Sequence, residues 1–204
     1  MRSHIACLMI LLGWLVVGLG YAQIRGGAEA AQFEPGDMVI YQEDLSGTPI
    51  GGQVEGWEIV QGSYEVAEFQ RRRWFRPLAY GTHILRQLRF PQEFSVEFTA
   101  YFFEPGNAEL RVFLHTEEET KREIGPDGPA QVYLTVGRVE KTDGFKLRKR
   151  IRPAGVIYQD VAQRGYDAYG GGFPADRPHH IALQVRGGEL ALFFDGERVA
   201  TTPF

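Results

Sequence analysis

The stretch from residue 179 to 203 constrains the fold more than any other part of the chain. Within it, Ile181, Leu183 and Val185 alternate with less apolar residues, the pattern of a strand with one buried face. Glycines 187–188 then supply a two-residue hairpin turn. The resulting register pairs opposite charges and apolar residues across the two strands: Arg186 with Glu189, Val185 with Leu190, Leu183 with Leu192, and Ile181 with Phe194.

A second turn at Asp195 and Gly196 continues this pattern into a third strand. It sets Phe194 opposite Glu197 and brings Val199 near Leu192. The stretch is therefore predicted to be an antiparallel meander with one buried face, which indicates an all-β fold without naming any chemistry.

The rest of the chain has the same character, with short alternating segments separated by turn residues. We expect strands at residues 38–44, 57–60, 63–69, 74–75, 83–88, 93–103, 110–115, 131–139 and 145–151, and a loop rich in Gly, Pro and Tyr at 153–178. The inward-facing residues are predicted to be Phe94, Val96, Phe98, Ala100 and Phe102, then Leu110, Val112 and Leu114, then Val132, Leu134 and Val136. This organisation predicts an all-β antiparallel sandwich or jelly roll.

The closing meander also carries a family resemblance. It resembles laminin-G-like, concanavalin A-like sandwich domains, in which a Trp-His-His-Val-Ala strand leads through a turn to a strand ending in Asp-Gly. The matching residues are His179, His180, Ile181, Ala182, Asp195, Gly196 and Val199, whereas Pro178 stands where those domains usually have Trp. The resemblance implies a concanavalin A-like antiparallel β-sandwich of the jelly-roll type.

The N-terminal half resembles a sandwich domain at the N-terminus of some outer-membrane protein A-like envelope proteins. The matching residues are Asp44, Ser46, Gly47, Pro49, Gly51, Trp57, Gly62, Pro91, Phe94, Glu97 and Phe98. The resemblance implies an envelope location. In such sandwiches the first strand usually lies beside the last, and more strands follow the Asp-Gly turn. We therefore expect the sequence to be a fragment that lacks its last strands.

Residues 1–22 have the pattern of a secretory signal peptide, with Arg2 before an apolar run and small residues ahead of a cleavage site at Ala22. The alternative is an uncleaved anchor, because the run is only slightly shorter than the roughly 20 residues that a membrane span needs. Residues 23–36 are then a linker and residues 37–204 the sandwich domain. Export to the periplasm, the outer membrane or the exterior follows from either reading, with the membrane contacted only through this segment.

Composition excludes several classes of function. The only cysteine, Cys7, lies inside the apolar run, so the exported chain has no disulfide, thiol nucleophile or thiolate metal site. One of the 22 basic residues and none of the 26 acidic ones precede residue 23, which leaves a net charge of −5. This acidity argues against a nucleic-acid binder. Nothing in the sequence calls for a cofactor.

Catalytic and metal motifs are weak. Laminarinase-type glycosidases of this fold carry Glu-x-Asp-x-x-Glu on one strand, whereas Glu93 and Glu97 lack that spacing and are expected on a solvated face. The 3-keto-disaccharide hydrolase-like family shares the strand layout, but its Gly-Asn-Ser-Gly stretch is replaced by residues 106–113. Adjacent His179 and His180 point to opposite faces of a strand and are expected to bond backbone groups rather than a metal.

Two features suggest a ligand. Alternation in 145–152 places four cations on one face, which suits an anionic polymer or, alternatively, a charged protective edge. The following loop brings aromatic rings beside carboxylates, a combination that suits sugars, although a plain covering loop has the same composition. The candidate residues are Lys146, Arg148, Arg150 and Arg152 for the row, and Tyr158, Tyr166, Asp167 and Tyr169 for the loop, with no metal ligand and no catalytic residue. By contrast, Arg71, Arg72 and Arg73 are expected to be solvated charge at a strand end.

These observations favour a non-catalytic, lectin-like binding module of the cell envelope, with a polysaccharide or an envelope protein as partner. Two alternatives stay open: a glycan-active hydrolase of the same fold, and a purely structural spacer.

Overall fold

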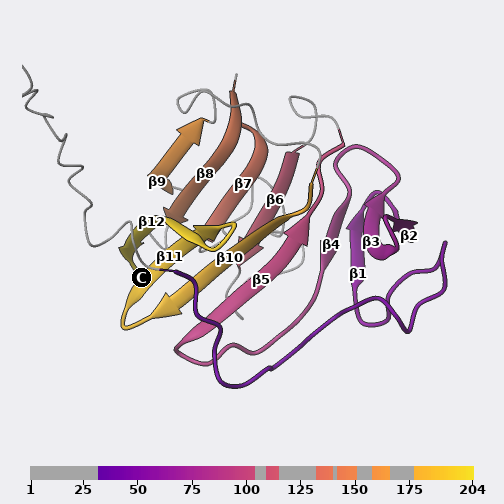
Figure 1. Ribbon diagram of the computed structural model, residues 1–204, viewed down its shortest axis with the longest axis horizontal. Coiled ribbons are helices and arrows are strands. Elements are labelled where there is room, and N and C mark those ends of the chain that lie inside the picture. The colour runs from indigo at the N-terminus through magenta and orange to yellow at the C-terminus, as the bar shows by residue number, and fades with distance from the viewer. Residues whose placement is uncertain (1–31, 104–108, 115–131, 140–141, 151–157, 166–176) are drawn as a thin grey trace, which may run out of the picture.

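The computed structural model describes residues 32–103, 109–114, 132–139, 142–150, 158–165 and 177–204, with only the backbone described for β9 and parts of β7 and β8 (Figure 1). Two four-stranded antiparallel sheets dominate these residues. The front sheet has the strand order β12 (Glu197–Pro203), β11 (Glu189–Phe194), β10 (His179–Arg186), β5 (Phe94–Ala100). The back sheet has the order β6 (Glu109–Leu114), β7 (Val132–Val139), β8 (Thr142–Arg150), β9 (Tyr158–Gly165).

The two large sheets pack face to face around one core. Fully buried side chains of the back sheet meet those of the front sheet in a single apolar cluster. The buried members are Phe102, Val132, Leu134, Val136, Leu147, Ile181, Leu183, Val185, Leu190, Leu192 and Phe194. The predicted inward residues of β5 and β6 line its rim, including Phe94, Phe98, Leu110, Val112 and Leu114. The prediction of an all-β antiparallel sandwich is confirmed.

The register predicted for the closing meander is confirmed. Arg186 pairs with Glu189 and Ile181 pairs with Phe194, with the intervening pairs as expected. Both turns use positive φ angles, 59° and 75° at residues 187–188 and 51° and 86° at residues 195–196. Such angles at both central residues define the type I′ turn that matches the twist of a hairpin.

The third strand, β12, contains a β-bulge. Phe194 pairs with Glu197 as predicted, and Val199 lies near Leu192, whose partner is Ala200 because the register shifts between Leu192 and Phe193. The extra residue on β12 still packs its side chain, since Val199 joins the rim of the core. A bulge of this kind inserts one residue without removing the apolar face.

Several predicted strand positions are wrong. Residues 38–44 form no strand, and Met38 and Val39 are 74% and 71% exposed, because no neighbouring strand pairs with this apolar run. The predicted loop 153–178 contains β9, which pairs with β8. The other strands lie near their predicted positions, with β4 (His83–Leu85) shorter than expected because it pairs only with the short strand β1 (Glu58–Gln61).

Residues 41–86 form an N-terminal lobe with its own small core, which comprises Leu45, Val54, Tyr64 and Val66. The lobe contains the β1–β4 pair and the hairpin of β2 (Tyr64–Phe69) and β3 (Arg72–Pro77). Arg73 is not the solvated charge that we expected. Its Nη1 lies 2.9, 2.9 and 2.6 Å from the carbonyl oxygens of Leu45, Ser46 and Thr48, so it fixes the turn beside the core.

Contacts of Tyr41 with Trp57 and Arg86 join parts of the lobe that are distant in the sequence. Trp57 donates through Nε1 to the hydroxyl of Tyr41 at 3.0 Å, and the Arg86 guanidinium lies 4.4 Å from the centroid of the Tyr41 ring. Burial raises the pKa of the Tyr41 phenol, and the hydrogen bond from Trp57 partly opposes that shift. These contacts account for Trp57 as an architectural residue.

Residues 32–36 cross the outer face of the front sheet, and we call them the strap. Phe33 packs against Ala182, Ala191 and Phe193, and its backbone N–H donates to the carbonyl of Gly196 at 3.0 Å. The predicted linker 23–36 therefore ends in residues that contact the sandwich. The proposed signal peptide and residues 23–31 lie outside the described residues. Among the residues that the structure describes, no helix is long and apolar enough to cross a membrane.

Candidate functional site

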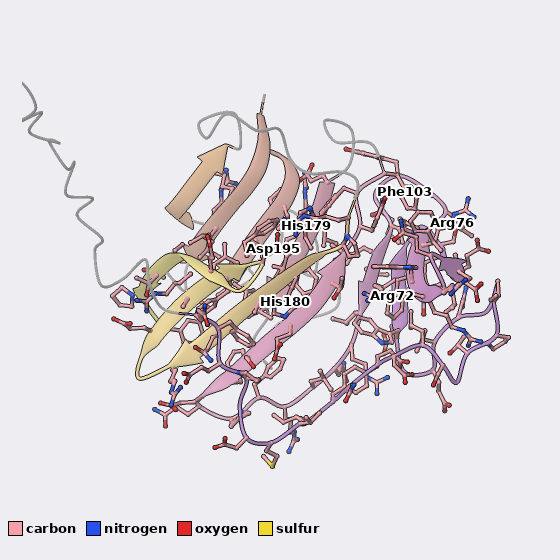
Figure 2. The ribbon with its side chains drawn as sticks, in the orientation of Figure 1. Arg72, Arg76, Phe103, His179, His180 and Asp195 are labelled. Carbon is pink, nitrogen blue, oxygen red and sulfur yellow. The ribbon has the colours of Figure 1, made fainter. Side chains whose placement is uncertain are left out.

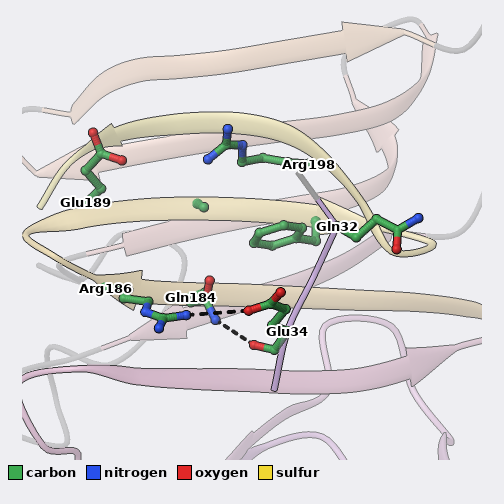
Figure 3. Close-up of a pocket in the computed structure, with 8 residues that line it drawn as sticks. Gln32, Glu34, Gln184, Arg186, Glu189 and Arg198 are labelled. Carbon is green, nitrogen blue, oxygen red and sulfur yellow. Dashed lines mark hydrogen bonds and ion pairs between the residues drawn. The ribbon is translucent and has the colours of Figure 1, made fainter. Parts of the chain in front are cut away.

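A hollow of about 570 Å³ lies on the outer face of the front sheet, beneath the strap (Figure 3). Its position follows from strand alternation, because residues next to the inward-facing core residues of β10 and β11 must point outward. We call it the outer groove. Eight residues line it: Gln32 and Glu34 from the strap, Gln184 and Arg186 from β10, Glu189, Ala191 and Phe193 from β11, and Arg198 from β12.

The floor of the groove is apolar and closely packed. Phe193 is 3% exposed and Ala191 is also buried, so other side chains already cover most of the floor. Phe33 packs edge to face on Phe193 at 5.2 Å between ring centroids and supports it from the side. The bottom of the groove is therefore closed by apolar packing, and the polar side chains of its walls are the groups that a ligand can reach.

The walls are polar and balanced in charge. Two guanidinium groups, two carboxylates and two carboxamides surround the floor, all of them planar groups able to form paired hydrogen bonds. Gln184 Nε2 donates to the carbonyl of Glu34 at 2.9 Å, and Arg186 Nη1 lies 3.9 Å from Glu34 Oε2 (Figure 3). The side chains of Arg186 and Glu34 are 66% and 82% exposed, so water surrounds this pair and a ligand can replace it.

A cluster centred on Asp195 lies where β10 begins and β11 ends, in the same sheet as the groove (Figure 2). Asp195 Oδ2 lies 3.0 Å from His179 Nδ1 and 2.9 Å from Arg177 Nη2, while Oδ1 accepts the backbone N–H of His180 at 3.0 Å. Because His179 is fully buried, this carboxylate is a structural partner rather than an open site. The two histidines point to opposite faces as predicted, and the side chain of each contacts a carboxylate.

The two glutamates considered as catalytic residues of a hydrolase, Glu93 and Glu97, each contact a different partner. Glu93 Oε1 accepts the backbone N–H of Gly187 at 2.8 Å, and Glu97 Oε2 lies 3.2 Å from His180 Nε2. Their partners lie at opposite ends of β10. A retaining glycosidase holds its carboxyl groups about 5–5.5 Å apart across one ligand. The geometry of Glu93 and Glu97 gives no support to that pairing.

The predicted cationic row divides between described and undescribed residues. On β8, Leu147 faces the core as the alternation requires, which sets Lys146 and Arg148 on the outer face. Lys146 is only 7% exposed and pairs across the sheet with Thr135, which is equally buried, while Arg148 is half-buried. Only the backbone of Arg150 is described, and Arg152 lies outside the described residues. The anionic-polymer site on β8 stays a prediction.

The first aromatic residue of the predicted loop lies in a strand. Tyr158 is the first residue of β9 and pairs with Arg150 of β8, so it belongs to a strand and not to a loop. The sequence pattern does not predict this strand, because apolar and polar residues do not alternate clearly over 158–165. Tyr166, Asp167 and Tyr169 lie outside the described residues, and their role in sugar binding stays a prediction.

The outer groove itself was missed from the sequence. Its residues come from three strands and from a strap more than 140 positions away along the chain, and only tertiary structure brings them together. The one available signal was the alternation in 184–198, where outward positions hold Gln184, Arg186, Glu189 and Arg198. In the described part of the chain, no group of three or more His, Cys, Asp or Glu side chains is placed to hold a metal ion.

Comparisons with known proteins give little beyond the fold. No protein-family model and no curated protein matches the chain, so the resemblances to laminin-G-like and outer-membrane protein A-like domains stay predictions. A solved structure that is similar is the carbohydrate-binding module CBM66 from Bacillus subtilis, with 16% identity and a TM-score of 0.47 over 73% of this chain and 80% of that chain. A likeness of this size carries no argument about the site.

Proposed function

We propose that this protein is a non-catalytic binding module for carbohydrate, and that a neutral saccharide binds in the outer groove. One observation carries the proposal: six planar hydrogen-bonding side chains line a hollow of about 570 Å³. That volume lies within the range of roughly 300–1,000 Å³ typical of small-molecule sites.

The chemistry of the walls matches a sugar. Each sugar hydroxyl both donates and accepts a hydrogen bond, so a ring with neighbouring hydroxyls needs donors and acceptors side by side. Arg186 and Arg198 supply donors, Glu34 and Glu189 supply acceptors, and the carboxamides supply both. Equal numbers of cations and anions favour a neutral ligand over a charged one.

A direct binding measurement tests the proposal. Neutral oligosaccharides on a glycan array identify the ligand, and titration calorimetry then compares the full chain with an Arg186→Ala variant. We expect affinity to fall about tenfold, because a hydrogen bond from a charged donor contributes on the order of 1.5–3 kcal/mol. Arg72→Ser, which removes an exposed arginine outside the groove, is the matched control and is expected to bind normally. Equal affinity in all three proteins would refute the groove as the site.

The same preparation tests the hydrolase alternative. We expect no new reducing ends when the protein is incubated with the glycan that it binds. Release of reducing ends that disappears in Glu93→Gln or Glu97→Gln would replace the binding proposal by an enzymatic one.

The envelope location is also part of the proposal, and it rests on the signal-like segment 1–22. N-terminal sequencing of the protein from an exported fraction is expected to begin at Gln23. A start at Met1 in membranes would instead indicate an uncleaved anchor.

A further inference from the structure

One face of the β2–β3 hairpin combines aromatic rings with arginines. The register pairs Glu65 with Arg76, Ala67 with Trp74, and Phe69 with Arg72. Directly opposed residues in an antiparallel pair point to the same side of the sheet. These six side chains therefore share one face, while Tyr64, Val66 and Phe75 on the other face build the core of the lobe.

Two rings from the main sandwich extend this face. Tyr101 and Phe103 follow β5, and both contact Phe69, with ring centroids 5.0 and 4.8 Å apart. Tyr101 also lies 6.2 Å from Trp74. Four rings thus form one cluster, and Phe103 is 67% exposed, which is unusual for so large an apolar side chain within a cluster. We call the six hairpin residues together with Tyr101 and Phe103 the aromatic hairpin face.

The charge on this face is positive. Arg72 and Arg76 are both exposed and flank Trp74 along β3 (Figure 2). Arg76 Nη1 lies 3.1 Å from Glu65 Oε1, and within the described residues no ion pair involves Arg72. The net charge of the whole chain is −4, so this local surface has the opposite sign to the chain as a whole.

We infer that the aromatic hairpin face binds an anionic polysaccharide, as a site separate from the outer groove. The spacing argues for an extended chain rather than a small anion. Four residues along a strand place the Cα atoms of Arg72 and Arg76 about 13 Å apart, a spacing that suits separate charges on an extended chain better than one small anion. A chain of acidic sugars offers a carboxylate to each arginine and an apolar ring face to Trp74 between them and to the neighbouring rings.

A polysaccharide fits this face better than single-stranded nucleic acid does. Nucleic-acid sites of this type combine stacking rings with a basic groove that follows a phosphate backbone. Here Glu65 offsets part of the charge of Arg76, and the molecule as a whole is acidic. A chain of acidic sugars combines carboxylates with apolar ring faces, and this combination suits two arginines and four aromatic rings.

Binding of polygalacturonate by the full chain tests the inference, with fully methyl-esterified polygalacturonate as the uncharged probe of the same rings. We expect binding to polygalacturonate, about tenfold weaker binding in the Arg72→Ser/Arg76→Ser double variant, and weaker binding at higher ionic strength. Phe103→Ala is expected to weaken binding severalfold, because it removes an exposed ring. Unchanged unfolding midpoints exclude a folding defect in these surface variants.

The control variants separate the two sites. Arg186→Ser in the outer groove is expected to leave polygalacturonate binding unchanged, whereas the double variant is expected to leave neutral-saccharide binding unchanged. The two ligands and the two variants therefore test each proposal independently of the other. Three outcomes would each overturn the inference. The esterified probe binds as tightly as polygalacturonate, or the double variant changes the affinity less than twofold. The third is that a thymidine oligonucleotide binds more tightly than polygalacturonate and the double variant abolishes that binding.

Discussion

At the scale of single residues, Asp195 explains why two histidines and an Asp-Gly turn occur together in this chain. Its carboxylate binds the side chains of His179 and Arg177 and the backbone N–H of His180. Its own N–H donates to the carbonyl of His180 at 2.7 Å, which closes the end of the β10–β11 hairpin. With a φ of 51°, the residue also occupies a backbone conformation that Asp and Asn tolerate better than other non-glycine residues.

We expect Asp195→Ala to lower the free energy of unfolding by about 2–4 kcal/mol, because it removes hydrogen bonds to charged or buried groups and places Ala at positive φ. Asp195→Asn is the matched control, since it keeps one acceptor oxygen and the turn conformation. It should cost about half as much. Urea denaturation of both variants measures the difference, and an alanine variant as stable as the parent chain would contradict this role.

At the scale of elements, the strap links stability to the outer groove. It holds Gln32 and Glu34 in the groove wall through one packed side chain, Phe33, and through its hydrogen bonds to Gly196 and Gln184. If the ring of Phe33 is removed, the strap loses its apolar anchor on Phe193. The groove then loses one wall, although no residue that lines it has changed.

We therefore expect Phe33→Ala to lower the free energy of unfolding by about 1–3 kcal/mol, less than the 3–5 kcal/mol for a fully buried Phe, and to weaken neutral-saccharide binding about tenfold. Calorimetry and urea denaturation measure the two effects. Phe33→Leu, which keeps an apolar anchor, should retain most of the affinity, and the exposed-site control Met38→Ser should change neither quantity. Full affinity in Phe33→Ala would show that the strap does not shape the site.

The same elements show how far the sequence determines the outcome. The β10–β11 register was predictable because Gly187 and Gly188 fix a two-residue turn and each apolar residue then has one apolar partner. The apolar run 38–44 misled because alternation and propensity do not reveal whether a pairing strand exists. On the hairpin, the i, i+2 spacing of Arg72, Trp74 and Arg76 was a visible signal, but the contacts to Tyr101 and Phe103 are tertiary.

At the scale of the whole molecule, the described residues have a sandwich core, a core in the N-terminal lobe, and a small apolar cluster beneath the strap. The sandwich core has eleven buried apolar residues drawn from both large sheets, whereas the N-terminal lobe has four. Since stabilisation grows with buried apolar area, the lobe should open at a lower free energy than the sandwich. The two proposed sites differ in the same way, because the outer groove lies on the sandwich and the aromatic hairpin face lies mainly on the lobe.

Two matched variants test this division, because Val66 in the lobe and Val136 in the sandwich are both fully buried valines. We expect each Val→Ala change to cost on the order of 2 kcal/mol within its own unit. Amide exchange should then show lower protection in β2 and β3 for Val66→Ala, and lower protection in β7, β10 and β11 for Val136→Ala. Equal loss across all strands in both variants would mean that the chain unfolds as one unit.

This division has a consequence for binding that a denaturant titration can measure. If the lobe opens first, low urea concentrations should remove polygalacturonate binding while neutral-saccharide binding persists, and Val66→Ala should shift only the first loss to lower urea. The physical reason is that Arg72, Trp74 and Arg76 keep their common face only while β2 and β3 stay paired. The groove depends instead on β10 and β11, whose inner residues lie in the larger core. Simultaneous loss of both binding activities would place both sites on one cooperative unit.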